Sequence, residues 1–246
     1  MGLINRFHAV SARMARINDA PCVRREPVLS LTFDDFPKSA WTTGGPILAE
    51  YGARATYYVA GRFCGAVEDG QRYFDRDDLT AIDAAGHEIG CHTFSHLQSR
   101  DLSTAQFHAD RQRNQRFLAE VLPGRVFDSF AYPYGNVSVR VKRAAARSSV
   151  TARGLRPAVN GDRLDLALLT AAPMERRSWR EAAFERLARR AADTGGWLIL
   201  FSHDVSDQPS PYGCTPAMLE SVLASARRLG LATLPVGEAA RRRAGI

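Results

Sequence analysis

Lysine is nearly absent from this basic chain of 246 residues. Only Lys38 and Lys142 are lysine among 33 basic residues, and the formal net charge is +7. Such uneven use of arginine is typical of a composition bias in the genome, and most of the arginines are spread along amphipathic stretches. The charge alone therefore does not predict nucleic-acid binding, although attraction to acidic glycans or lipid headgroups remains an alternative.

Long apolar runs are also missing. The longest apolar stretches have the length of a strand, which excludes a transmembrane helix. Residues 1–20 carry Arg6, Arg13 and Arg16 and contain no apolar run long enough for a secretory signal. We therefore expect a cytoplasmic protein.

Linkers, repeats and paired cysteines are absent as well. With 45% hydrophobic residues the chain can bury a sizeable core, and without a Pro/Ser-rich linker it is predicted to be a single domain over residues 1–246. Residues 1–26 are predicted to be an N-terminal extension of that domain. The cysteines show no C-x-x-C spacing and are expected to be free thiols; they are Cys22, Cys64, Cys91 and Cys214.

Apolar stretches of strand length alternate with helical patterns along the chain. Strands are expected at 28–33, 53–60, 87–91, 126–131, 148–152, 164–170, 197–201 and 231–236. Helices are expected at 46–51, 77–85, 138–147, 180–192 and 215–229, with a long helix from Ser103 to just before Pro123. This alternation predicts a parallel sheet, in which the active residues follow the carboxyl ends of the strands.

Two pairs of side chains carry the chemistry. Asp34 and Asp35 end an apolar strand; they could form a turn with Pro37, but two buried neighbouring carboxylates repel each other unless a cation compensates. His92 and His96 lie four residues apart and would share one face of a helix. Two neutral imidazoles and one carboxylate are the usual protein ligands of a catalytic Zn²⁺ site, and a second carboxylate can act as a base. The chain is therefore predicted to be a metal-dependent hydrolase.

Four motifs follow one another in an order that resembles a known family. They are Thr32 to Asp35, His92 to His96, Phe130 to Gly135 and Leu198 to His203. Their order and separations resemble those of the polysaccharide deacetylase family, also called the NodB homology domain or carbohydrate esterase family 4. The resemblance extends from about Val28 to Val236.

The resemblance implies both a fold and a set of roles. The fold would be α/β, a distorted (β/α) barrel with about seven parallel strands in a single domain. Asp35, His92 and His96 would hold one divalent metal, with Zn²⁺ as the default and Co²⁺ or Ni²⁺ as alternatives. By the same resemblance, Asp34 would be the catalytic base and His203 the general acid. The backbone N–H of Tyr134 would bind the oxyanion, and the segment that contains Pro133 would form a wall of the substrate site.

Long polar loops at the carboxyl ends of strands are predicted to recognise the substrate. They span residues 36–45 and 204–216, and Trp41 and Tyr212 are candidate stacking surfaces for a sugar ring. His87 is expected to pack or to support the site. Cys91 is expected to point away from His92, because neighbouring side chains on a strand alternate.

The chain departs from the family pattern at three points. Phe36 stands where the family usually has glycine, and Ala131 stands where an arginine usually pairs with the base. The tuning of Asp34 is therefore expected from elsewhere, with the metal charge as the main candidate. No residue is evident that orients His203; the candidates are Asp165, Asp204 and Glu175.

These expectations predict an N-deacetylase that removes acetyl groups from an amino-sugar glycan. Its partner would be an N-acetylated glycan or a lipid-linked amino sugar, with no nucleic acid. Two alternatives stay open: a metal-dependent amidase or esterase on a substrate other than a glycan, and a non-catalytic glycan-binding module.

Overall fold

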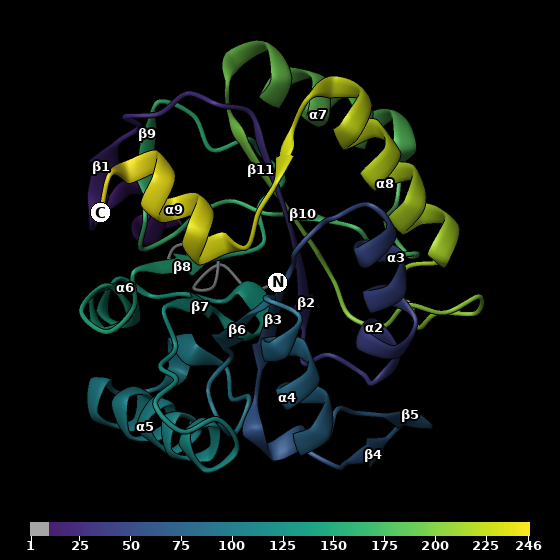
Figure 1. Ribbon diagram of the computed structural model, residues 1–246. Helices are drawn as coiled ribbons and strands as arrows, with labels where there is room; N and C mark the ends of the chain where they lie inside the picture. The colour runs from purple at the N-terminus through teal and green to yellow at the C-terminus, as the bar shows by residue number, and fades with distance from the viewer. Residues whose placement is uncertain (1–9) are drawn as a thin grey trace.

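A curved sheet of parallel strands forms the centre of the computed structural model, which describes residues 10–246 (Figure 1). The strand order is β10-β11-β2-β3-β6-β7-β8, and β12 pairs with the beginning of β2. This arrangement confirms the predicted α/β fold, a distorted barrel of about seven parallel strands. The strands are β2 (Val28–Asp34), β3 (Thr56–Val59), β6 (Glu88–Cys91), β7 (Ser129–Ala131), β8 (Thr151–Arg153), β10 (Ala172–Pro173), β11 (Trp197–Ser202) and β12 (Ala232–Thr233).

The central strands β2 and β11 are buried along their whole length. Strands covered on both faces are expected to be almost continuously apolar, and the polar exceptions must find hydrogen-bond partners. Ser30 accepts a hydrogen bond from Trp197 Nε1 at 2.9 Å and donates one to the Leu234 carbonyl at 2.7 Å. Thr32 donates to the Leu200 carbonyl. The polar side chains Ser30 and Thr32 of β2 thus find partners, and the pairing of β2 with β11 from Val28 to Phe33 supports the loops that follow both strands.

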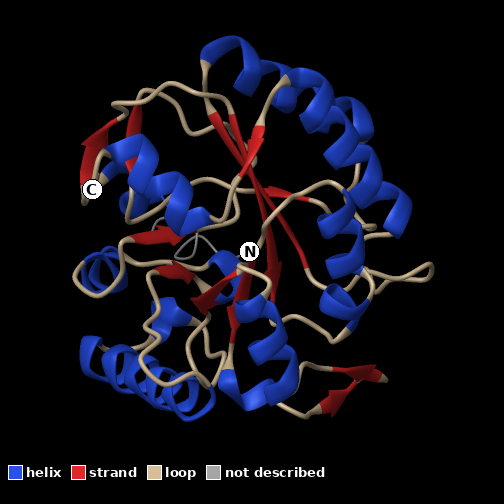
Figure 2. Cartoon of the chain, viewed as in Figure 1, coloured by secondary structure: helices blue, strands red, loops and turns tan. Residues whose placement is uncertain are grey.

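Helices surround the sheet on its outer face (Figure 2). Polar side chains fix where several of them begin: Asp75 and Ser103 form capping boxes, and Thr215 caps the last long helix. The helices are α2 (Ser39–Thr42), α3 (Gly44–Glu50), α4 (Arg76–Ala84), α5 (Thr104–Val121), α6 (Val139–Ala146), α7 (Glu181–Thr194) and α8 (Pro216–Leu229). Three short 3₁₀ turns are η1 (Gly61–Phe63), η2 (Ser99–Asp101) and η3 (Pro133–Gly135).

A final helix, α9 (Val236–Ala244), was not predicted from the sequence, where a strand was expected up to residue 236. Its first two backbone N–H groups donate to Thr56 Oγ1 and Glu88 Oε2, at the beginnings of β3 and β6. Arg243 is buried and donates to the carbonyls of Glu26 and Gly195. This helix therefore covers the amino ends of the strands and leaves their carboxyl ends free for a site.

The sheet stays open between β8 and β10, where residues 155–171 fill the gap. The strand expected at 164–170 is wrong in part, because only β9 (Arg163–Asp165) is a strand, and it pairs antiparallel with β1 (Asp19–Pro21) outside the main sheet. The segment after β9 follows β8 instead: Ala152 N–H donates to Leu166 O, and Gly154 N–H donates to Leu169 O.

A buried lysine holds the beginning of the described chain against this gap. Lys142 Nζ donates to the carbonyls of Ala12 and Ala15 at 2.8 and 2.7 Å and pairs with Asp165. Burial lowers the pKa of Lys142, while the pairing with Asp165 favours its charged form. One of the two lysines thus has a structural role.

The predicted N-terminal extension, residues 1–26, stays a prediction, and its first nine residues, Arg6 included, lie outside the described part of the chain. Within residues 10–246 no helix is long and apolar enough to cross a bilayer. All four cysteines are free, as expected.

Candidate metal centre and active site

Asp35, His92 and His96 meet at the carboxyl ends of β2 and β6. One ligand atom from each lies within 4.8 Å of the others, and no other group of this kind occurs among residues 10–246. His92 Nε2 is 3.7 Å from Asp35 Oδ1, and His96 Nε2 is 3.3 Å from Asp35 Oδ2. All three side chains are shielded from solvent, so the predicted ligand set converges on one point.

Unusual backbone conformations gather at this point. Asp35, Thr93, His96 and Tyr134 have positive φ angles of 54°, 61°, 51° and 58°; in the described chain only Asn18 and Asp69 join them among residues other than glycine. Residues other than glycine rarely adopt positive φ angles, and clusters of such residues mark functional sites. The segment from His92 to His96 is a loop and not a helix, so the two imidazoles do not meet through a shared helical face. Its left-handed residues bring the two imidazole ring centroids to 5.0 Å instead.

Helix α5 holds this histidine loop in place. Asp110 accepts hydrogen bonds from the backbone N–H groups of Phe94 and Ser95, both at 3.0 Å, and from the Ser95 hydroxyl at 2.7 Å. Asn114 bonds to the Val59 carbonyl and accepts from the Gly61 N–H. The sequence analysis missed both residues, because their partners lie far away along the chain.

The protonation states of the ligands suit a metal ion. Burial lowers the pKa of His92 to about 3 and that of His96 to about 2, so both imidazoles are neutral near pH 7. His92 Nδ1 donates to the Ala131 carbonyl at 2.8 Å, which leaves Nε2 as the ligand atom. Burial and the neighbouring charge of Asp34 raise the pKa of Asp35, whose Oδ1 is buried without a hydrogen-bond partner. A divalent cation would supply the missing partner.

Arg153 provides the counter-charge for Asp34, which was expected mainly from the metal. Its guanidinium is fully buried and pairs with Asp34 Oδ1, and it lies over the Tyr58 ring at 4.7 Å from the centroid. In the sheet, Arg153 on β8 is the register partner of Ala131 on β7, where the family's arginine is missing. The arginine therefore stands one strand further along. Its position directly after the predicted strand 148–152 was the signal that could have identified it.

Tyr134 forms one wall of the site. Its ring centroid is 4.6 Å from that of His96, and the side chain is 55% exposed. Pro133 precedes it in the turn η3 but is buried, so Tyr134 and not Pro133 presents the accessible surface here.

His203 follows β11, close enough to His92 and His96 for its charge to add to the burial that lowers their pKa values. Its Nδ1 lies 3.3 Å from the Tyr212 carbonyl, which orients the ring and leaves Nε2 free. None of the three candidate carboxylates has this role. Asp165 pairs with Lys142, Asp204 accepts from the backbone and side chain of Ser210, and Glu175 pairs with Arg177.

The two candidate stacking residues lie in different places. Tyr212 is 47% exposed, its ring centroid is 5.6 Å from that of His203, and the Arg177 guanidinium lies over the ring at 4.0 Å from the centroid. Trp41 instead packs edge-on against Tyr57 and His87, and His87 lies before β6, at the opposite end of that strand from His92. Trp41 is partly buried and packs against the core, and its interpretation as a sugar platform stays a prediction.

Phe36, His87 and Cys91 have packing roles around the site. Phe36 is buried and stacks on Phe74 with ring centroids 4.4 Å apart, which anchors the loop after Asp35. His87 accepts a hydrogen bond from the Ala55 N–H, and burial lowers its pKa to about 4. Cys91 Sγ lies 3.4 Å from Asn114 Nδ2, away from the metal ligands as expected.

Curated relatives share part of the sequence. The chain is 30% identical over 105 residues to a chitin deacetylase of Pestalotiopsis sp and 30% identical over 139 residues to one of Colletotrichum lindemuthianum. These alignments cover 43% and 51% of this chain but only 33% and 52% of the two fungal proteins. A chitooligosaccharide deacetylase of Azorhizobium caulinodans is 26% identical over 200 residues, which are 80% of this chain and 79% of the relative.

Solved structures share the fold. A family 4 acetyl xylan esterase from Clostridium thermocellum, in complex with a cobalt ion, superposes with a TM-score of 0.55 and 20% identity over 86% of this chain and 89% of its own. A family 4 pseudoenzyme from Bacillus anthracis gives 0.54 and 15% identity over 88% and 66%. The sequence profile of the family described as Polysaccharide deacetylase matches residues 23–152, more than half of the chain. The chain therefore belongs to the polysaccharide deacetylase family.

Proposed function

We propose that this protein is a metal-dependent N-deacetylase that releases acetate from an amino-sugar glycan. The observation that carries the proposal is the buried Arg153–Asp34 pair beside the Asp35, His92 and His96 cluster. A charged base next to a complete set of metal ligands is what hydrolysis of an amide requires. The deacetylase relatives support an acetylated glycan as the substrate class.

Each residue of the site has one task in this mechanism. A divalent ion held by Asp35, His92 and His96 would supply a Lewis acid for the acetyl carbonyl and for the attacking water. Asp34 accepts the proton of that water, and Arg153 pairs with its carboxylate and orients it. The Tyr134 backbone N–H donates to the oxyanion as it forms. His203 then protonates the leaving amine, and acetate and a free amino sugar depart.

A second candidate is a metal-dependent esterase or amidase on another substrate. The esterase among the structural neighbours and the Phe36 anchor of the loop after Asp35 motivate it. A non-catalytic role has less support, because the base, the three ligands and His203 are all present. Acetate release measured on chito-oligosaccharides, acetylated xylan and simple amides separates the candidates. Release from chito-oligosaccharides supports the proposal, and release only from the others contradicts it.

Metal binding is expected to release protons. Because burial raises the pKa of Asp35, the metal-free site holds a proton at pH values below that raised pKa, and an incoming ion must displace it. Affinity should therefore fall as the pH falls. Calorimetric titration of the metal-free protein with Zn²⁺, in buffers of different ionisation enthalpy, gives the number of protons released on binding. A stoichiometry other than one ion, or an affinity that increases toward acid pH, would contradict the assignment.

The two neighbouring aspartates are expected to respond differently to substitution. Asp35→Asn should lose the bound metal, because it removes a charged ligand. Asp34→Asn should keep the metal and lose about 10²- to 10⁴-fold in turnover, the usual contribution of a general base. Metal content and acetate release are measured on both variants; the reverse pattern would show that the two roles are exchanged.

Arg153 is expected to be replaceable from the neighbouring strand. Arg153→Met should lower turnover on the order of 10²-fold, because Asp34 loses the group that positions it. It should also lower the free energy of unfolding by about 3–5 kcal/mol, because the buried Asp34 carboxylate is left without its partner. The double variant Ala131→Arg/Arg153→Ala returns an arginine at the register partner.

Turnover and unfolding free energy are compared across the two variants. Recovery of turnover in the double variant would support the positioning role. A double variant that regains stability without regaining turnover would contradict it.

His203 is expected to matter more for amides than for activated esters. His203→Ala should leave the metal content unchanged and lower turnover sharply on an N-acetyl amide. It should affect an aryl acetate ester much less, because that leaving group departs without a proton. Equal losses on the two substrates would mean that His203 holds the site together and donates no proton.

A further inference from the structure

A basic pocket lies at the open seam of the sheet, outside the residues used so far. It has a volume of about 230 Å³ and is formed by the ends of η3 and β8, the segment 155–170 and the N-terminal residues that pack on it. Its charged lining consists of four arginines and one acidic residue, Asp165, which already pairs with Lys142. We call this site the arginine pocket; its arginines are Arg13, Arg16, Arg156 and Arg163.

Two of these arginines are free to bind a ligand. Arg16 and Arg163 share a single carboxylate, that of Asp19, whose pKa they lower. Arg13 and Arg156 are exposed, and neither pairs with a carboxylate of residues 10–246. Residues 1–9 contain no acidic side chain that could pair with them. The pocket therefore carries an excess of positive charge that the protein itself does not compensate.

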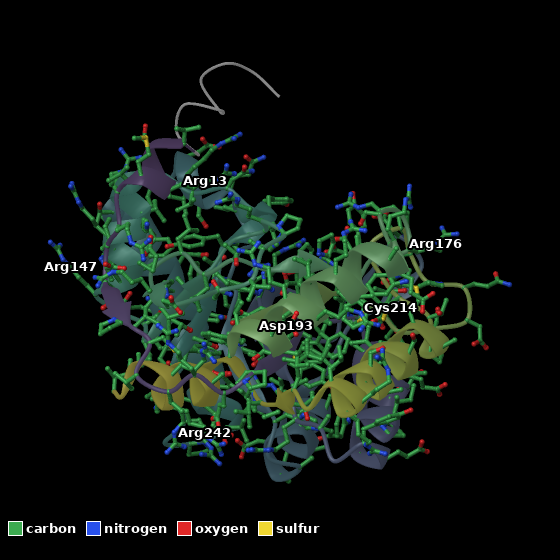
Figure 3. The ribbon with its side chains drawn as sticks, turned by 90° about the horizontal axis from the view of Figure 1, so that it is seen from above. Arg13, Arg147, Arg176, Asp193, Cys214 and Arg242 are labelled. Carbon is green, nitrogen blue, oxygen red and sulfur yellow. The ribbon has the colours of Figure 1, made fainter. Side chains whose placement is uncertain are left out.

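The pocket borders the metal site through two pairs of consecutive residues. Gly135 lines it and follows Tyr134, whose ring contacts that of His96 at a tilt; Gly154 lines it and follows Arg153, which pairs with Asp34. Figure 3 shows Arg13 at the opposite end of the molecule from Arg242 of α9, the helix that covers the amino ends of the strands. The pocket and the metal ligands thus belong to the same end of the sheet.

The wall of the pocket is rigid. Asn160 is buried, and its amide donates to the carbonyls of Thr170 and Trp197 while its oxygen accepts from the Thr170 N–H at 2.9 Å. These bonds fix the segment 155–170 against β11. A hydrogen-bonded wall beside exposed cationic side chains suits a charged group attached to a larger ligand.

We propose that the arginine pocket binds an oxyanion, a phosphate or a carboxylate, carried by the same molecule whose N-acetyl group reaches the metal site. The substrate would then be an acidic N-acetylated amino sugar and not a neutral one. This inference rests on the proposed function. Guanidinium groups bind both oxyanions through paired N–H donors, so the chemistry is shared and the source is decided by experiment.

The test compares a charged with a neutral substrate. Acetate release is measured from N-acetylglucosamine 1-phosphate, from N-acetylmuramic acid and from neutral diacetylchitobiose. The unmodified protein should prefer one of the acidic sugars, and the double variant Arg13→Ala/Arg156→Ala should reduce that ratio of kcat/KM about fivefold or more, since exposed charge pairs contribute a few-fold each. Preference for the first sugar assigns a phosphate, and preference for the second assigns a carboxylate.

A matched control removes the same charge elsewhere. Arg186 and Arg190 are exposed on α7 and form no ion pair in the described chain. Arg186→Ala/Arg190→Ala should keep both the ratio and the activity. The proposed role of the arginine pocket would be overturned if the unmodified protein showed no preference for an acidic sugar, or if that preference survived the loss of Arg13 and Arg156.

A binding measurement separates this inference from the proposed function. Calorimetry with N-acetylglucosamine 1-phosphate and N-acetylmuramic acid needs no turnover, and binding of one of them should weaken with salt and in the Arg13→Ala/Arg156→Ala variant. Such binding without acetate release would support the pocket and overturn the deacetylase proposal. Acetate release at equal rates from charged and neutral sugars would do the opposite.

Discussion

Two neighbouring carboxylates at the buried end of β2 set the requirements for the rest of the site. Asp34 and Asp35 are 4% and 8% exposed, and neither charge can persist there without a cation. The fold supplies one cation, Arg153, to Asp34. Among residues 10–246 no lysine or arginine pairs with Asp35, whose raised pKa and unpartnered oxygen leave a place for a metal ion. The division of labour between base and ligand follows from this asymmetry.

The same principle explains how the basic residues are used. The buried cations each bind specific carbonyls or carboxylates: Lys142 holds the beginning of the described chain, Arg243 fastens α9, and Arg153 positions the base. The consecutive arginines of α9 are paired as well: Arg241 pairs with Asp128 before β7, and Arg242 pairs with Glu238. The unpaired positive charge that borders the metal site lies in the arginine pocket.

The sequence predicts those features that depend on local pattern. Strand and helix alternation predicted a parallel sheet, and the Asp34-Asp35 strand end with the His92-His96 spacing predicted a metal site of carboxylate and imidazole ligands. The distorted barrel and the choice of Asp35 over Asp34 as the ligand came from the resemblance to the family. Features that depend on register between strands were harder to predict, and Arg153 is the clearest example. Its place after a predicted strand marked it as a candidate, but its pairing with Asp34 depends on the register of β7 with β8, which the sequence does not give. Helix α9 was missed for a similar reason, since its partners at the beginnings of β3 and β6 are distant in sequence.

The account depends most on the claim that Asp35, and not Asp34, shares a metal ion with the two histidines. Anomalous diffraction from crystals grown with Co²⁺ tests it directly. The account predicts one ion at roughly 2 Å from a carboxylate oxygen of Asp35 and from Nε2 of His92 and His96, with Asp34 still paired to Arg153. An ion bound by Asp34, or no ion between the two imidazoles, would contradict it.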